Sequence, residues 1–407
     1  MPGESMPGSE TLNSLRQHPG INKAFSFIRN SETAFTAEQI RICEIPAPTF
    51  AEQERGEYIA ARFRDLGLAE VEIDLEGNVC GLLHGQADDI LVAVSAHLDT
   101  VFPLDTDVRV RRYAAKLVAP GIGDNASGLA AMIAMIEAIK AAGIRPRGSI
   151  LFVATVGEEG EGDLRGARFL FTQHHLAGRI THFISFDGPG CELITTQALG
   201  SRRYRITLEG PGGHSWTDFG VVNPIHALGR AIARLSELSV PFEPRTTYNV
   251  GRIVGGSSVN VIPERASIDV DIRSVEESEL SRVEDFLLSS VNFAVRAENS
   301  IRAASHQGLK VDVNLIGHRP SGDTSRNSRI VELAIEATKA VGFKPLINCA
   351  STDANIPISM GIPAITIGAG GKGGDAHRLS EWYDPAGRDR GYQRALLLIL
   401  GLTGLAS

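Results

Sequence analysis

Four short apolar stretches limit what this chain can fold into more than any other feature. Each is rich in β-branched or aromatic residues and lacks polar alternation, which is typical of strands buried on both faces of a parallel sheet. These stretches are 90–96 (ILVAVSA), 149–156 (SILFVATV), 182–186 (HFISF) and 363–367 (PAITI). Helical patterns at 127–142 and 166–174 lie between them. Alternating strands and helices predict an α/β fold with a mostly parallel sheet sandwiched by helices.

Residues 201–316 show a different pattern of apolar and polar residues. Their strand-like runs alternate apolar and polar residues, which indicates strands with one face in solvent. They are 202–210, 266–274 and 309–317, and helical patterns lie between them at 223–238 and 278–298. Two helices on one face of a small antiparallel sheet form an α+β layout. We therefore expect residues 201–316 to be an inserted α+β domain.

The expected domain boundaries follow from this change in the pattern of apolar and polar residues. Residues 21–200 and 317–407 are expected to form one α/β domain, interrupted by the insertion. The length of 407 residues is itself typical of two or more domains. Residues 1–20 carry no hydrophobic periodicity, and we expect them to be a flexible tail.

Composition and charge argue against several classes of protein. The net charge is −8 and no basic block occurs, so no nucleic-acid partner is expected. No apolar run reaches the roughly 18–20 residues of a membrane span, and the first residues lack the layout of a signal peptide. The four cysteines form no CxxC pair, which favours free thiols over a disulfide framework or a thiolate metal site. We expect a cytoplasmic protein with no membrane partner.

Acidic and histidine side chains follow each of the four predicted strands. They are His97 and Asp99 after the first, Glu158 and Glu159 after the second, Asp187 after the third, and His377 after the fourth. A fifth group, Asp124 in GIGDNASG, lies directly before a predicted helix. Imidazole and carboxylate ligands suit zinc or a similar divalent ion.

Each of these groups, taken alone, also has a structural explanation. A structural histidine beside a turn aspartate, a helix cap and a solvated acidic turn would account for His97 with Asp99, for Asp124 and for the glutamate pair. Their joint position favours a site, because open α/β sheets bind ligands at the carboxyl ends of their strands. Neighbouring side chains diverge, so one glutamate can bind metal while the other faces substrate as a base. The sequence therefore predicts a metal-dependent hydrolase.

The motifs resemble those of the M20 metallopeptidases. The segments are SAHLDTV, GIGDNASG, GEEGEGDLRGARF, SFDGPG, GPGGHSW and GGDAHRLSEW, in the order expected of that family across residues 35–400. The family includes tripeptide aminopeptidases, dipeptidases, glutamate-releasing carboxypeptidases and N-acyl-amino-acid deacylases. The resemblance implies a zinc-exopeptidase-like catalytic domain, and it implies that the insertion is a lid and dimerisation domain of a homodimer.

The resemblance also implies a role for each residue of the predicted centre. Two zinc ions, with cobalt or manganese as substitutes, would share a water and polarise the scissile carbonyl. Asp124 would bridge the ions, His97 and Asp187 would complete one ligand set, and Glu159 and His377 the other. Asp99 would orient His97, and Glu158 would be the general base that moves the proton to the leaving amine.

Three residues of the insertion match family residues that contact substrate. His214 in GPGGHSW would support the oxyanion, often from the partner subunit of a dimer, although a structural histidine is the alternative. Asn260 and Arg273 would bind the substrate's carboxylate, for which arginine offers two parallel hydrogen bonds. A turn asparagine and a solvated strand arginine are the alternatives for these two residues.

Hydrolysis of short peptides is the function we expect first. The family implies a two-zinc exopeptidase acting on di- and tripeptides, and aspartate at position 187 favours the aminopeptidase and dipeptidase branch. The runner-up is an N-acyl-amino-acid deacylase, which would use the same chemistry with a different substrate pocket. A non-catalytic binding protein is a third possibility, and the intact set of ligands with Glu158 argues against it.

Overall fold

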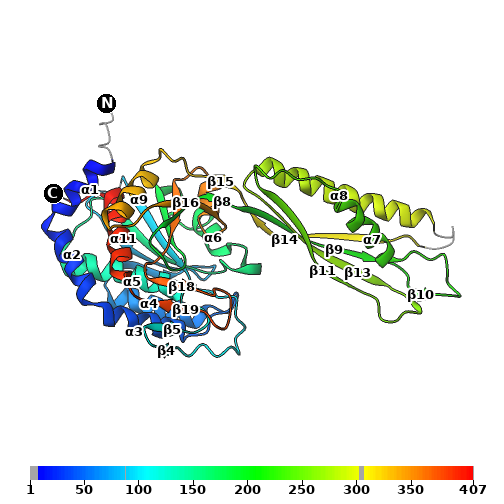
Figure 1. Ribbon diagram of the computed structural model, residues 1–407, viewed down its shortest axis with the longest axis horizontal. Coiled ribbons are helices and arrows are strands. Elements are labelled where there is room, and N and C mark those ends of the chain that lie inside the picture. Colours follow the sequence, from blue (N-terminus) through cyan, green and yellow to red (C-terminus); the bar gives the residue numbers. More distant parts are fainter. Residues whose placement is uncertain (1–7, 88, 302–306, 407) are drawn as a thin grey trace. The chain divides into compact units, whose positions relative to one another are not determined.

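A computed structural model describes residues 8–87, 89–301 and 307–406. The chain divides into two compact units (Figure 1). Unit 1 comprises Met1–Ala198 with Asp323–Ser407, and unit 2 comprises Leu199–Gly322. Among the described residues, no helix is long and apolar enough to cross a membrane.

Unit 1 is built on a nine-stranded sheet. Its order is β1-β2-β6-β3-β7-β17-β8-β15, and β16 pairs with β8. The strands are β1 (Ala69–Ile73), β2 (Val79–Leu83), β3 (Leu91–His97), β6 (Ser149–Thr155), β7 (His182–Phe186), β8 (Leu193–Ala198), β15 (Gly322–Asp323), β16 (Leu346–Ala350) and β17 (Ala364–Ile367). The four predicted strands are β3, β6, β7 and β17, and they form the parallel centre of the sheet.

Helices cover both faces of this sheet, as predicted. They are α1 (Gly8–Gln17), α2 (Pro19–Asn30), α3 (Glu32–Cys43), α4 (Gln53–Asp65), α5 (Ala126–Ala142), α6 (Arg165–Thr172), α9 (Arg329–Ala340), α10 (Asn355–Ser359) and α11 (Arg388–Thr403), with short 3₁₀ turns at Gly160–Gly162 and Ala177–Arg179. Alternate residues of β3 enter different cores. Val92 and Val94 join the core that contains α5 and α11, whereas Leu91 and Ala93 join the core that contains α6 and α10. Period-two alternation between two apolar layers explains why the strand sequences do not alternate between apolar and polar residues.

A smaller four-stranded sheet in unit 1 carries loops of the predicted centre. Its order is β18-β19-β5-β4, with β4 (Arg111–Tyr113), β5 (Lys116–Val118), β18 (Lys372–Gly374) and β19 (Trp382–Asp384). The chain leaves β5 directly before the Asp124 loop, and His377 lies between β18 and β19. This sheet therefore brings together two segments that are distant in the sequence.

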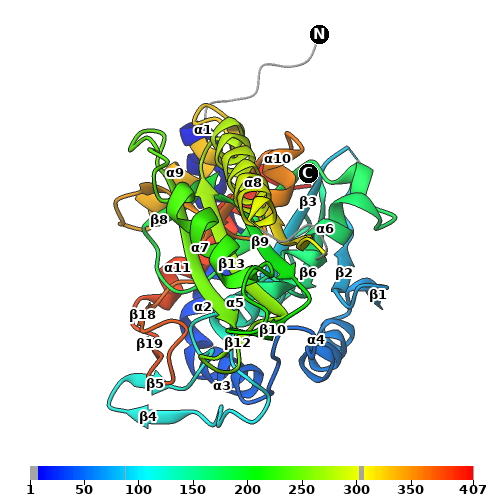
Figure 2. The ribbon, with the colours of Figure 1, turned by 90° about the vertical axis from the view of Figure 1, so that its right-hand side faces the viewer.

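Unit 2 is the α+β layout that the alternating pattern predicts. Its antiparallel sheet has the order β11-β13-β9-β14, and a separate pair joins β10 to β12. The elements are β9 (Gly200–Glu209), β10 (Gly213–His214), α7 (Pro224–Leu235), β11 (Thr246–Gly255), β12 (Val261–Ile262), β13 (Arg265–Ser274), α8 (Glu277–Ser300) and β14 (Lys310–Arg319). Helices α7 and α8 pack on one face of the sheet (Figure 2). A separate apolar core lies between the helices and the sheet.

Two of the expected boundaries need correction. The flexible tail predicted for residues 1–20 is wrong from Gly8 onward, because α1 and the start of α2 lie there and Leu12 and Leu15 are buried in the core. Residues 1–7 lie outside the described residues. The predicted return to the main domain at Gly317 falls inside β14, because a register shift between Leu315 and Gly317 lets the strand continue to Arg319.

Candidate metal centre

The carboxyl ends of the four central strands place the predicted ligands at one edge of the sheet. Strands β6, β3, β7 and β17 are neighbours in that order and run parallel. His97 ends β3, the glutamate pair follows β6, and Asp187 follows β7. This is the edge at which open α/β sheets bind ligands, because the strand-to-helix loops converge there.

Asp124 lies between the two predicted histidine ligands. Its Oδ1 atom is 3.0 Å from His97 Nε2, and its Oδ2 atom is 3.2 Å from His377 Nε2. Glu159 Oε1 is 2.9 Å from the same His377 nitrogen, and Asp187 Oδ1 is 3.7 Å from His97 Nε2. The five predicted ligands therefore form two sets that share Asp124.

The loop that carries Asp124 is held by a residue that the sequence reasoning missed. Glu381 accepts hydrogen bonds from the backbone N–H groups of Gly121, Gly123 and Asp124, each at 2.8 Å. Burial raises the pKa of Glu381 to about 7, against the opposing effect of these hydrogen bonds. Its place in the motif HRLSEW, four residues after His377, was the available signal.

Asp99 holds the glutamate loop more closely than it holds His97. Its two carboxylate oxygens accept the backbone N–H groups of Glu158 at 2.9 Å and Glu159 at 3.0 Å, and Thr49 donates its hydroxyl at 2.9 Å. The nearest partner of His97 Nδ1 is the backbone carbonyl of Asp99 at 3.0 Å, whereas the Asp99 carboxylate is 3.6 Å away. Asp99 thus joins the end of β3 to the end of β6.

The carboxylates around the two imidazoles shift their protonation. Hydrogen bonds to Asp124 and Glu159 raise the pKa of His377 to about 10. Burial alone would lower the pKa of His97, but hydrogen bonds to Asp124, Asp187 and Asp99 raise it well above its usual value. Burial alone would raise the pKa of Asp124, and its hydrogen bonds to the two histidines lower it instead. The site is an anionic cage that attracts a cation, whether a proton or a metal ion.

The two adjacent glutamates differ in position, as their predicted roles require. Glu159 groups with His97 and Asp124 in a set whose ligand atoms lie within 4.8 Å of one another. Glu158 is buried and is not a member of that set. The two neighbouring carboxylates therefore lie in different surroundings, and Glu159 is the one that groups with candidate metal ligands.

A second buried carboxyl lies beneath the centre and was also missed by the sequence reasoning. Asp353 Oδ2 accepts the hydroxyl of Thr155 at 2.6 Å, and among the described residues its Oδ1 has no hydrogen-bond partner. Burial raises the pKa of Asp353 to about 6. No pattern in the sequence marked it, because it follows no predicted strand.

Unit 2 brings His214 and Asn260 together and places Arg273 elsewhere. Strand β10 ends at His214, and the Ser215 N–H donates to the Asn260 carbonyl at 3.0 Å. His214 Nδ1 accepts the Trp216 N–H at 3.2 Å, so in the neutral ring Nε2 carries the proton and can donate it to an oxyanion. Arg273 pairs with Asp271 at the opposite end of β13, and the strand from Arg265 to Arg273 spans about 26 Å.

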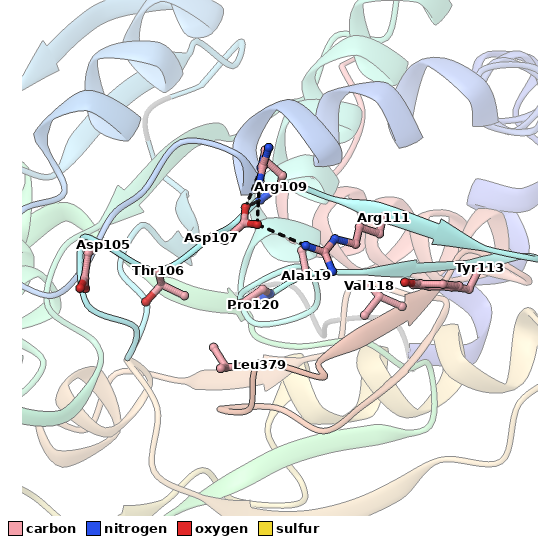
Figure 3. A pocket seen from close by; sticks show the side chains of 10 residues that line it. All are labelled: Asp105, Thr106, Asp107, Arg109, Arg111, Tyr113, Val118, Ala119, Pro120 and Leu379. Carbon is pink, nitrogen blue, oxygen red and sulfur yellow. Dashed lines mark hydrogen bonds and ion pairs between the residues drawn. The ribbon is translucent and has the colours of Figure 1, made fainter.

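A cavity of about 420 Å³ borders the segments that carry Asp124 and His377 (Figure 3). Ala119 and Pro120 in its wall precede the Asp124 loop, and Leu379 follows His377. The charged groups in it pair with each other, since Arg109 donates two hydrogen bonds to Asp107 at 2.9 Å and Arg111 adds a third at 3.3 Å. The guanidinium groups are exposed, so these pairs contribute little stability.

The centre and the fold together define the class of protein. Two imidazoles and three carboxylates at the carboxyl ends of a parallel α/β sheet, with a buried glutamate beside them, are the side chains that a metal-dependent hydrolase requires. Residues 93–400 match the model of peptidase family M20/M25/M40, and the chain belongs to that family. It is therefore a metallopeptidase-type hydrolase that acts on peptide bonds.

The curated relatives include an uncharacterized protein and a named enzyme. The uncharacterized protein YqjE of Bacillus subtilis is 24% identical over 353 residues, which cover 84% of this chain and 91% of that protein. A succinyl-diaminopimelate desuccinylase of Leptothrix cholodnii is 28% identical over 248 residues, covering 54% of this chain and 63% of the relative.

Solved structures with this fold include two peptidases. The aminopeptidase PepT of Bacillus cereus superposes with a TM-score of 0.73 at 21% identity, covering 91% of this chain and 98% of that chain. The YXEP protein of Bacillus subtilis, described as a dinuclear metal-binding peptidase, gives a TM-score of 0.66 at 18% identity and covers 92% and 99% of the two chains. These likenesses confirm the predicted fold, a parallel α/β domain with an inserted second domain.

Proposed function

We propose that this protein is a two-metal exopeptidase that hydrolyses di- and tripeptides. The observation that carries the proposal is the position of Asp124, whose two oxygens face the imidazoles of His97 and His377 separately. A carboxylate with one histidine at each oxygen suits a bridging ligand between two divalent ions. The name of the YXEP protein as a dinuclear metal-binding peptidase supports the same reading.

The residues present fit zinc, and also fit cobalt or manganese. His97 and Asp187 would hold one ion, Glu159 and His377 would hold the other, and Asp124 would touch both. Nitrogen and carboxylate oxygen donors without thiolates are the usual ligands of catalytic zinc. Bound ions of this kind lower the pKa of water and polarise a carbonyl. Asp99 would keep the two glutamates in place through its hydrogen bonds to their backbone N–H groups.

Glu158 is the proposed proton carrier. It would accept a proton from the attacking water and deliver it to the amine that leaves, so one carboxylate serves first as base and then as acid. Its burial next to the predicted ligand Glu159 supports this role. Its neighbour Glu159 is engaged by His377 and is not available for the task.

Glu158→Gln tests this assignment. We expect the variant to lose hydrolysis by at least about 100-fold, since general acid–base catalysis contributes about 10²–10⁴-fold. Metal content should stay at the wild-type level, because the five ligands are unchanged. Turnover is measured on a panel of dipeptides and tripeptides with zinc, cobalt or manganese added, and bound metal by elemental analysis. Wild-type turnover in the variant would refute the role of Glu158.

The residues of unit 2 that are predicted to contact substrate lead us to propose a homodimer. His214 and Asn260 lie beyond the Arg265 end of β13, and Arg273 lies about 26 Å from that end along the strand, so a single small substrate cannot touch all three in one subunit. If all three act on substrate, at least one of them serves the site of the partner, and for His214 the family resemblance implies that role. A two-fold dimer provides such an exchange in both directions.

Mixed dimers test this arrangement. When Glu158→Gln and His214→Ala chains are co-expressed, half of the dimers combine one chain of each kind, and one of their two sites has both intact residues. About a quarter of wild-type activity should then appear, although each variant alone is nearly inactive. A mixture as inactive as the separate variants would place His214 in the site of its own chain.

N-acyl-amino-acid hydrolysis is the second candidate. It is favoured by the similarity to a protein named as succinyl-diaminopimelate desuccinylase. Aspartate at position 187 and the fold of an aminopeptidase named PepT favour the peptidase. Comparison of kcat/KM for dipeptides against N-acetyl and N-succinyl amino acids decides between them, and faster turnover of the acylated set would overturn the peptidase proposal.

We also propose a cytoplasmic location. All four cysteines are free thiols, and three of them are buried. Unpaired cysteines suit a reducing compartment, where disulfides do not persist. Fractionation of expressing cells with an antibody to the protein is the direct test.

A further inference from the structure

We infer that a pocket bordered by Asp187 and lined by a row of uncharged polar side chains receives a side chain of the substrate next to the scissile amide, and that it selects uncharged side chains that form hydrogen bonds. This inference rests on the proposed peptidase function and specifies its substrate class. The pocket belongs entirely to unit 1 and has a volume of about 240 Å³. That volume suits a small or medium side chain.

A row of three polar residues forms one wall of the pocket. Thr366 of β17 is the register partner of Thr195 of β8, and Thr195 is the register partner of Asn348 of β16. Residues paired directly across neighbouring strands project to the same face of a sheet. The row therefore presents two hydroxyls and an amide side by side, in a sheet whose central strands contribute mainly apolar side chains to the cores on its two faces.

Hydrogen bonds within the wall leave the NH₂ group of Asn348 available to a ligand. The Thr195 hydroxyl donates to Asn348 Oδ1 at 2.8 Å, and the hydroxyls of Thr352 and Thr366 lie 2.7 Å apart. The three threonines are buried, whereas Asn348 is half-exposed. Among the residues that the structure describes, none accepts a hydrogen bond from the Asn348 NH₂ group. This amide is therefore the group that can recognise an acceptor on the substrate.

The pocket opens on the metal centre through Asp187. This carboxylate is part of the pocket wall, and its Oδ1 atom is 3.7 Å from His97 Nε2. A side chain in the pocket is thus attached to a backbone that lies at the centre, where the amide must be cleaved. The other charged residues of the centre do not line the pocket.

The charge of the wall decides which side chains fit. Asp187 is the one ionisable residue among those that line the pocket, and in the proposed function a metal ion engages it. An acidic side chain would lose its hydration without a cationic partner, which is costly for an ion. A glutamine or asparagine side chain offers a carbonyl oxygen to the Asn348 amide and carries no charge. We therefore expect amide side chains to be preferred over their acidic isosteres.

Matched dipeptides test the pocket in the metal-loaded enzyme. Gln against Glu, and Asn against Asp, are compared by kcat/KM at each position of the dipeptide in turn. At one position the amide member should be favoured by about tenfold or more, because a site that reads a hydrogen-bonding group rejects the wrong partner strongly. In Asn348→Asp this preference should persist, and kcat/KM should rise for a dipeptide with lysine at that position. In Asn348→Leu the preference for Gln over Leu should be lost.

The controls separate this inference from the proposed function. Asn327→Asp, at an exposed residue outside the pocket, should leave every ratio unchanged. Thr195→Val, which removes the donor to Asn348, should weaken the preference for Gln if Asn348→Leu does not fold. Hydrolysis of peptides with ratios that no Asn348 or Thr195 variant alters would overturn the pocket and leave the peptidase intact. Failure to hydrolyse any peptide or acyl amino acid would overturn the proposed function, and the pocket with it.

Discussion

At the scale of single residues, His377 shows how a proton and a metal ion can occupy the same place in the centre. Its imidazole is 2.9 Å from Glu159 and 3.2 Å from Asp124, so in the metal-free protein a proton takes the place of a cation. The same two carboxylates would hold the ion that His377 helps to bind. Protons and metal ions therefore compete for this site, and metal binding tightens as the pH rises.

The stability of the metal-free protein should depend on pH through His377. Its pKa is about 10 in the folded chain, against about 6.5 for an unfolded histidine. The protonated form is thus favoured by folding, and its contribution is complete below about pH 6.5 and lost as the pH rises through 10. Urea unfolding in the presence of a chelator should give a lower free energy of unfolding at pH 10 than at about pH 6.5. His377→Gln should reduce this difference, whereas His226→Gln, at an exposed residue of unit 2, should not.

At the scale of elements, the junction between β6 and α6 controls where the glutamate pair lies. Asn78 Oδ1 accepts the Val156 N–H at 3.1 Å, and its Nδ2 donates to the Gly166 carbonyl at 3.1 Å. Gly166 is packed directly against this junction, with Val156 backbone atoms 2.5 and 2.6 Å from the place that a Cβ would occupy. Only glycine permits so close an approach of the helix to the strand end.

Gly166→Ala should disturb both stability and catalysis. The added methyl group meets backbone, which cannot move aside as a side chain can, so we expect a loss of about 1–3 kcal/mol in the free energy of unfolding. Displacement of the loop should also lower kcat, because the loop carries Glu158 and Glu159. Glu158 lies three residues after Thr155, which ends β6. Gly178→Ala is the matched control, since its Cβ would meet nothing within 4 Å. Equal stability of the two variants, measured by denaturant unfolding, would contradict this packing argument.

At the scale of the whole molecule, metal binding should stabilise only the unit that contains the predicted ligands. All five predicted ligands lie in unit 1, whereas unit 2 has its own apolar core between a sheet and two helices. A ligand that binds only the native state stabilises the unit that contains its site, by about 2.7 kcal/mol at 100 times its Kd. The two units should therefore respond differently to metal.

Calorimetry of the full chain tests this difference. We expect two thermal transitions. Zinc should raise the midpoint temperature of one and leave the midpoint of the other within error of its metal-free value. His97→Ala should abolish the shift, and His214→Ala should preserve it because His214 lies in unit 2. A single transition that moves as a whole with metal would show that the two units unfold together.

The fold was predictable where the local pattern had a single explanation. Strands β3, β6, β7 and β17 are mostly apolar because both faces of the sheet are covered, and runs of that kind were predicted at 90–96, 149–156, 182–186 and 363–367. Strand β11 was not predicted, because its sequence TTYNVGRIVG contains two glycines and exposed residues at an edge of the sheet. Helix α1 was missed because its buried face holds few apolar side chains.

The sequence by itself determined the kinds of ligand, their order along the chain, and the strand after which each one falls. Those properties are local, since a strand's burial and a ligand's place after it are written in a few consecutive residues. The tertiary structure alone decided that Asp124 lies between two histidines, that Glu381 holds its loop, and that Asp99 serves the glutamates. These are contacts between residues far apart in the chain, and they depend on the register of strands and the path of loops, which no local pattern encodes.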